Sequence, residues 1–217
     1  RNTDKDAYSY GGRAQHWLAD RLRIGVTGTN EKGEEATRRA VGADFQLRLS
    51  PKTQIEGEIA RSHGRGFQSV VSTDGGLTFG GEGASTASGE GAVAWRLRGE
   101  LDLEDLRGLG LKGAIGGGYE ERKAGFSEIA NDTSVDQKAW DAHADLEMTD
   151  NLGLKLGYKE FRDGAGQVRQ DADAASVWDI GNKLSFSAGI SHTRLISPEA
   201  IAAGKSGYDG SRVDGGV

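Results

Sequence analysis

Strict alternation of apolar and polar side chains is the feature that most constrains how this chain can fold. In the segment 152–159, Leu152, Leu154, Leu156 and Tyr158 alternate with glycine and lysine. The same period of two recurs in 41–49, 93–103 and 184–191. Successive side chains of a β-strand point to opposite faces, so the pattern indicates strands with one apolar face and one hydrated face.

The alternation predicts an all-β chain of about ten antiparallel strands, with an eleventh beginning near residue 211. The expected strands are 7–18, 22–30, 38–49, 53–63, 90–103, 109–122, 137–148, 152–162, 170–180 and 184–195. The segment 198–203 is the one place where a helical turn is expected.

The predicted connections alternate in length. Three-residue turns of turn-forming residues are expected at 19–21, 50–52, 149–151 and 181–183, and a five-residue turn at 104–108. The others are longer and more polar: 31–37, 64–89, 123–136, 163–169 and 196–210. This is typical of outer-membrane barrels, in which tight turns face the periplasm and long loops face outward.

The three-residue turns also predict which side chains face each other across each hairpin. The expected pairs are Trp178 with Phe186, Phe45 with Gly57, Asp145 with Lys155, Asp141 with Lys159 and, unfavourably, Asp44 with Glu58. Opposite charges directly across a strand pair stabilise it by roughly 0.2–1 kcal/mol. In all four hairpins apolar residues meet apolar ones, which a register shifted by one residue would destroy.

Composition narrows the function classes. Only 35% of residues are hydrophobic, and no stretch approaches ~18 consecutive apolar residues, so a membrane-spanning helix is excluded. None of the 217 residues is cysteine, so the sequence contains no disulfide framework. Glycine is frequent, at 35 residues. The net charge of −6, without a basic cluster, argues against a nucleic-acid partner.

We interpret the chain as an antiparallel up-and-down transmembrane β-barrel, 12 strands or more in the intact protein. Aromatic residues gather toward strand ends, as in a membrane girdle; they are Trp17, Trp95, Tyr119, Trp140, Tyr158 and Trp178. The residues expected to face lipid or form the girdle are Phe45, Trp95, Leu97, Trp140, Leu154, Leu156, Tyr158, Trp178 and Phe186. The charges expected to face the lumen are Arg48, Glu56, Glu58, Arg96, Arg98, Glu100, Lys112, Asp141, Asp145, Lys155 and Lys159. A soluble extracellular β-sandwich is the alternative fold.

Four stretches place a short turn before an alternating strand: LADRLRIGVTG, LSPKTQIEGEIARS, MTDNLGLKLGYKEF and IGNKLSFSAGISHT. These resemble the hairpins of proteobacterial outer-membrane barrels. The segments GFQSVVSTDGGLTF and AGFSE are similar to the C-terminal barrels of large multidomain surface proteins. Such barrels end in an amphipathic strand with a terminal aromatic residue, whereas this chain ends in Gly215-Gly216-Val217. We therefore expect 1–217 to be a single barrel domain truncated at one or both ends.

Few residues suggest chemistry. Asp141, His143 and Asp145 share one face of a strand, but a spacing of about 6.5–7 Å is wide for one metal ion, so ion pairs are the preferred interpretation. Ser191 and His192, with Asp163 or Asp171, could be imagined as a hydrolase site, although nothing in the sequence fixes their geometry. Gly116–Gly118 lacks the Lys-Ser/Thr ending of a phosphate loop. Loop residues that could bind Ca²⁺, without a supporting motif, are Asp74, Asn131, Asp132, Asp163 and Asp209.

The sequence thus predicts a non-enzymatic porin-like channel or membrane anchor in the outer membrane of a Gram-negative bacterium. No catalytic residue, cofactor or metal is expected. Lipid and lipopolysaccharide are the expected partners, with other surface proteins or further segments of the same polypeptide as candidates. One alternative is a binding or adhesion module that displays the loops 64–89 and 196–210, and another is an outer-membrane enzyme.

Overall fold

The computed structural model describes residues 8–32, 37–64, 71–72, 79–80, 91–106, 108, 110–128, 131–181, 184–198 and 207–216. The chain divides into two compact units. One contains Arg1–Gln46, Gly57–Arg96 and Glu121–Gln137. The other contains Leu47–Glu56, Leu97–Glu120 and Lys138–Val217.

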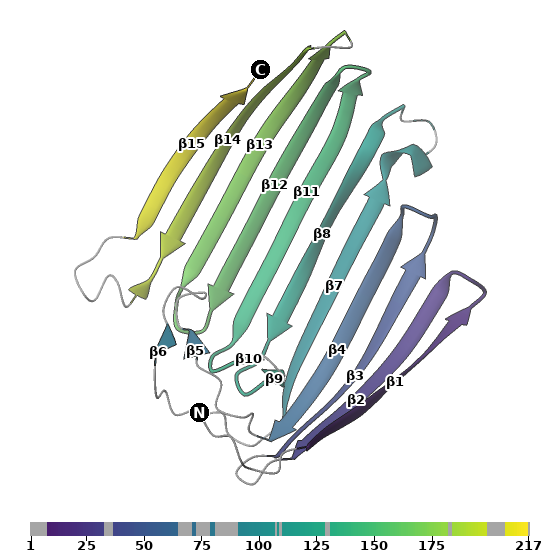
Figure 1. The fold of residues 1–217 in the computed structure, drawn as a ribbon, viewed down its shortest axis with the longest axis vertical. Coiled ribbons are helices and arrows are strands. Elements are labelled where there is room, and N and C mark those ends of the chain that lie inside the picture. Colours follow the sequence, from purple (N-terminus) through teal and green to yellow (C-terminus); the bar gives the residue numbers. More distant parts are fainter. Residues whose placement is uncertain are drawn as a thin grey trace. The chain divides into compact units, whose positions relative to one another are not determined.

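An antiparallel sheet of eleven strands dominates the structure, and its strands follow one another in sequence order (Figure 1). They are β1 (Tyr8–Leu18), β2 (Leu22–Lys32), β3 (Thr37–Arg48), β4 (Gln54–Gly64), β7 (Ala92–Asp102), β8 (Lys112–Arg122), β11 (Gln137–Thr149), β12 (Leu152–Asp163), β13 (Val168–Ile180), β14 (Leu184–Ile196) and β15 (Tyr208–Gly216). Two small hairpins, β5 (Val71–Ser72) with β6 (Phe79–Gly80) and β9 (Ser127–Glu128) with β10 (Asn131–Asp132), lie in long connections. The predicted all-β, up-and-down antiparallel architecture is confirmed.

The predicted registers are also found. Trp178 is the Cα partner of Phe186. The ring of Phe45 covers Gly57, where an added Cβ would lie 2.4 Å from Cε1 of the ring. Lys155 Nζ lies 3.3 Å from Asp145 Oδ2. Turn length together with alternation was therefore sufficient to predict the pairing in these hairpins.

Several connections differ from the expected ones because the strands run further than the apolar pattern does. β2 extends to Lys32 and β13 starts at Val168, so 33–36 and 164–167 are short connections. The predicted strand 109–122 begins only at Lys112, because the 3-10 helix η1 (Leu103–Asp105) follows β7. Pro198 is helical, and the rest of the predicted helical turn lies outside the described residues.

The structure has little apolar interior. Among the described residues, the buried hydrophobic ones are Ala92, Ala94, Leu103 and Phe126. Seven of the nine side chains predicted to face lipid or form the girdle are exposed, among them Leu97 by 45%, Trp178 by 53% and Phe186 by 38%, whereas Leu154 and Tyr158 are half-buried. Trp17 was wrongly placed in the aromatic girdle, because its register with Arg23 puts it on the charged face.

The turn before β4 and the helix η1 are tied together by hydroxyl groups. The side chains of Ser50 and Thr53 both donate hydrogen bonds to Asp105. Thr53 Oγ1 also accepts from the backbone N–H of Asp102 at 3.1 Å. The hydroxyl of Ser50, followed by that of Thr53, holds the pKa of Asp105 below its ordinary value.

We expect Asp105→Asn to destabilise this turn in a pH-dependent way. A carboxyl whose pKa is lowered by folding stabilises the protein above its unfolded pKa, and this contribution is lost as pH falls through the folded value. The difference in unfolding midpoint between wild type and variant should therefore shrink on acidification. Denaturant titrations at several pH values would measure it, with Asp150→Asn as the exposed control. A pH-independent difference would contradict this account.

Gly113 occupies a backbone conformation that side chains avoid, with φ of 122°. An added Cβ would lie 2.1 Å from the backbone oxygen of Asp145. Left-handed strain costs about 1–3 kcal/mol, and the clash adds to it because a backbone atom must move.

Gly113→Ala should therefore lower the free energy of unfolding by about 1–3 kcal/mol or more. Gly153→Ala is the matched control, since the nearest atom to its Cβ would be 4.0 Å away. Equal denaturation midpoints for the two variants would refute the prediction.

Candidate functional site

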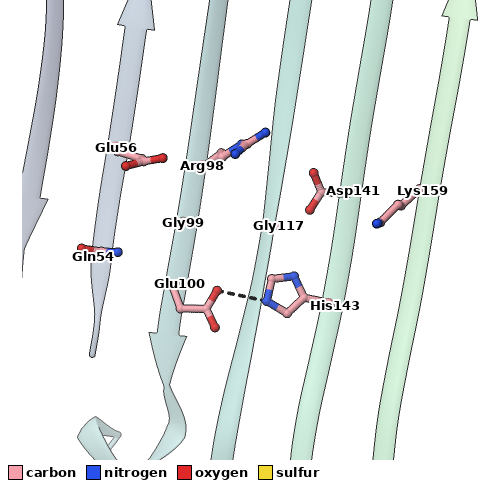
Figure 2. Close-up of a pocket in the computed structure, with 9 residues that line it drawn as sticks. All are labelled: Gln54, Glu56, Arg98, Gly99, Glu100, Gly117, Asp141, His143 and Lys159. Atoms are coloured by element: carbon pink, nitrogen blue, oxygen red, sulfur yellow. Dashed lines mark hydrogen bonds and ion pairs between the residues drawn. The ribbon is translucent and has the colours of Figure 1, made fainter. Parts of the chain in front are cut away.

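A pocket of about 370 Å³ on the charged face of the second unit brings together five of the charges predicted to face the lumen. It spans β4, β7, β8, β11 and β12 (Figure 2). Its lining residues are Gln54, Glu56, Arg98, Gly99, Glu100, Gly117, Asp141, His143 and Lys159. Two cationic and three acidic side chains therefore face the same small volume of water.

Glycines on β8 allow side chains to meet across a whole strand. Glu100 of β7 and His143 of β11 are not on neighbouring strands, yet Oε2 and Nε2 lie 3.0 Å apart above β8. A Cβ on Gly116 would lie 2.1 Å from that Glu100 oxygen and 2.7 Å from His143 Cε1. The bridge exists because Gly116 has no side chain.

A second pair of side chains approaches in the same way over β8, two residues further along the strand at Gly118. A Cβ on Gly118 would lie 2.9 Å from Arg98 Cγ and 3.2 Å from Asp141 Oδ1. Figure 2 shows Arg98 and Asp141 extending toward β8 from the strands on either side. Close packing of side chains over β8 thus explains Gly116 and Gly118, whereas a Cβ on Gly117 would meet the backbone oxygen of Asp141.

The other predicted lumen charges form separate contacts. Arg96 pairs with Glu58 at 2.8 Å, and Lys112 lies 3.9 Å from Asp150. Arg48 also interacts with another residue. Most of these side chains are substantially exposed, so each pair contributes little stability by itself.

In the first unit, charged side chains also meet above a glycine of the strand that lies between them. Arg13 of β1 reaches Asp44 of β3 at 2.7 Å, across β2. Asp44 lies over Gly25, where a Cβ would be 2.5 Å from Oδ2. Arg23 also approaches Asp44, at 3.5 Å. The unfavourable contact expected between Asp44 and Glu58 is therefore offset by arginines on the neighbouring strands.

Phe126, in the connection 123–136, packs against the sheet. Phe126 is only 3% exposed and packs against Ala92 and Ala94, with Ala60 beside them. These alanines share the parity of Glu58 and Arg96, so the phenylalanine covers the charged face. Sequence reasoning missed this contact, although an isolated Phe opposite a row of alanines was the available signal.

The base of this connection is held by a cluster around Lys123. Its ammonium group lies 2.7 Å from Glu121 and 3.0 Å from Asp136. Hydrogen bonds from Lys123, to Glu121 first and then to Asp136, raise its pKa above the ordinary value. The backbone N–H of Lys123 donates to Val93 of β7 at 3.0 Å, which fixes the loop to the sheet.

The imagined hydrolase set does not converge. Ser191 pairs with Asp173 on the charged face, whereas His192 lies on the other face. Asp171 accepts from Thr193, and Asp163 Oδ1 caps a turn by accepting from Ala165 and Gln167. Among the residues described, no group of three or more histidines and carboxylates could hold a metal ion. Asp74 lies outside the described residues.

Glu160 was not foreseen as a buried charge, although it lies on the face of Leu156. It is 7% exposed and accepts hydrogen bonds from Tyr158, Gln170 and Arg162. The rings of Trp140 and Tyr158 lie 4.5 Å apart beside it. The apolar face therefore ends at Glu160 in a polar zone that is flanked by aromatic rings.

Comparison with known proteins yields little information. No protein-family model and no curated protein matches the chain. A solved chain described by the words "Unveiling the Mechanism Behind the in-meso Crystallization of Membrane Proteins" aligns with 97% of this chain and 76% of its own length. The sequence identity is 10% and the TM-score 0.34, a likeness that carries no argument about fold or function. In the part of the chain that the structure describes, no helix has the length and hydropathy needed to cross a membrane.

Proposed function

We propose that this chain is a segment of an outer-membrane β-barrel of a Gram-negative bacterium, acting as a narrow porin-like channel or as a membrane anchor. One observation carries the proposal: on one face of the sheet large apolar side chains stand exposed at alternating positions, while charged residues, small polar residues and glycines occupy the positions between them. In β12–β15, Leu156 is 41%, Ile190 52% and Val213 77% exposed, and register places them in one row.

Hydrocarbon is the environment that suits such a face. A water-soluble protein rarely exposes contiguous apolar patches beyond a few hundred Å². The same side chains facing lipid incur no such penalty, and their charged neighbours then face a hydrated interior. A soluble β-sandwich would instead bury this face against a second sheet. Lipid and lipopolysaccharide are accordingly the partners we propose.

Closure of the sheet into a barrel is part of the proposal. Unpaired backbone groups at a sheet edge are too costly in lipid, so strands that span a membrane must form a closed ring. In the observed order β1 and β15 stand at the two ends. We propose that they are completed by each other or by further strands of the same polypeptide.

The charged face suits a restricted, water-filled passage. Arg98 and Lys159 oppose Glu56, Glu100 and Asp141 around one pocket, so an ion passing there would experience both signs of charge. Phe126 covers a further part of the charged face in the first unit. Display of the loops 64–89 and 196–210 to a partner remains a prediction, because most of those residues lie outside the described part.

Two neighbouring alanines on β13 test which face meets lipid. Ala174 pairs with Leu156 and Ile190, and Ala175 pairs with Lys155 and Gly189. Arginine facing lipid costs about 2–4 kcal/mol at mid-membrane and less toward the headgroups, whereas a like-charge neighbour in water costs under about 1 kcal/mol. Ala174→Arg should therefore destabilise the protein in vesicles far more than Ala175→Arg.

Denaturant unfolding in lipid vesicles, with heat-modifiable gel migration as the folding assay, would measure this difference. Equal losses, or a greater loss for Ala175→Arg, would reverse the assignment of faces.

Planar-bilayer conductance tests the channel. Because Arg98 and Lys159 supply the positive side of the pocket, the double variant Arg98→Glu/Lys159→Glu should shift the reversal potential toward cation selectivity. Lys138→Glu, on the face of Trp140, is the control and should leave selectivity unchanged. Folded protein without any current would leave the anchor as the function, and an unchanged reversal potential in the double variant would refute a conducting pocket.

A further inference from the structure

Polar residues interrupt the apolar face of β12–β15 in two adjacent rows. Register places Tyr158, Ala172, His192 and Ser211 in one row, and Glu160, Gln170, Arg194 and Asp209 in the next. The row on the other side of Tyr158 contains Leu156, Ala174, Ile190 and Val213. The change from hydrocarbon-like to polar surface therefore occurs within about 7 Å along the strands.

Three members of these rows form a serine–histidine–aspartate arrangement across β14 and β15. Nδ1 of His192 lies 3.0 Å from Ser211 Oγ. Nε2 of the same ring lies 3.5 Å from Asp209 Oδ1. A ring proton on Nε2 places that N–H beside the Asp209 carboxylate and leaves Nδ1 free to accept the Ser211 hydroxyl proton.

We propose that Ser211 and His192 are catalytic residues of an ester-hydrolysing site on the outward face, with Asp209 as the positioning residue and lipid acyl esters as substrate. The arrangement of nucleophile, base and orienting carboxylate is that of acyl-transfer sites, in which geometry identifies the roles. The Cα pairing of His192 with Ser211 holds base and nucleophile together on rigid strands.

We choose the substrate class from the depth of the site in the bilayer. This choice rests on the proposed membrane placement. Aromatic side chains mark the headgroup boundary of a bilayer. Tyr158, which contacts Trp140, lies in the same row as His192 and Ser211. Acyl esters of phospholipids and of lipopolysaccharide lie at that boundary, between the hydrocarbon chains and the polar heads. The substrate would thus reach the site without leaving the membrane.

The reaction requires water as its only co-reactant. Ser211 Oγ attacks the ester carbonyl carbon while His192 takes the hydroxyl proton, and the carbonyl π electrons move to oxygen. The tetrahedral intermediate collapses, its C–O bond to the lipid alcohol breaks, and His192 protonates the departing alkoxide. Water, deprotonated by His192, then hydrolyses the acyl-serine to a free fatty acid and returns the proton to Ser211.

We assign to Arg194 the role of stabilising the negative charge that develops on the carbonyl oxygen. It follows His192 by two residues on the same face and is the Cα partner of Asp209. A guanidinium beside low-dielectric lipid stabilises an oxyanion more strongly than it would in water.

The experiment uses the full chain refolded in vesicles of phosphatidylethanolamine and phosphatidylglycerol, and separately in lipopolysaccharide-containing vesicles. A fluorophosphonate probe should label the wild type, and fatty acid should be released in the vesicle type that supplies the substrate. Ser211→Ala should abolish labelling, and Asp209→Asn should lower the rate by about 100-fold and alter its pH profile. Ser191→Ala, beside His192 but on the opposite face, is the matched control and should retain both activities.

Vesicle flotation and heat-modifiable migration establish that each variant is inserted and folded. Failure to insert, by the chain alone and by a longer polypeptide that adds the strands needed to close the sheet, would overturn the membrane proposal itself. Inserted wild-type protein that is not labelled and releases no fatty acid would overturn only the esterase site, and would leave His192 and Ser211 as a structural hydrogen bond. Labelling that survives Ser211→Ala would also overturn it.

Discussion

Antiparallel backbone pairing in a single register is the constraint on which the rest of this structure depends. Each residue's partner is set by the ladder, so every side chain is committed to one of two faces. Trp178 meets Phe186 and Leu156 meets Ala174 on the apolar face, while Lys155 lies beside Ala175 on the charged one. A register shift of one residue would exchange the two faces. Charged side chains would then lie where we propose contact with lipid.

Glycine adds a second level of organisation on the charged face. Where a strand presents glycine there, side chains from the strands on either side meet above it, as Arg13 and Asp44 do over Gly25 and Glu100 and His143 do over Gly116. Each charge can then find a partner two strands away as well as beside it. This spacing accommodates several long charged side chains on one face, and it lets Arg13 and Arg23 offset the like charge expected opposite Asp44.

The two faces suit different functions because their surroundings differ. Charges around the pocket of Arg98, Asp141 and Lys159 would act through a field on dissolved ions. The rows of His192 and Glu160 lie instead where the apolar face ends, so any chemistry there would meet the lipid boundary. The two sites therefore lie on opposite faces of one sheet, the pocket over β4 to β12 and the His192 cluster over β14 and β15.

The sequence by itself determined the strands, their order and the face of most side chains, Trp17 excepted, because a period of two and three-residue turns are local properties. It also determined that Arg98, Glu100 and Asp141 share a face. Only the tertiary structure decided which strands these side chains bridge, that Phe126 packs on Ala92 and Ala94, and that His192 meets Ser211 and Asp209. These contacts join segments separated by long connections, where turn chemistry sets no register and pairing depends on the assembled sheet.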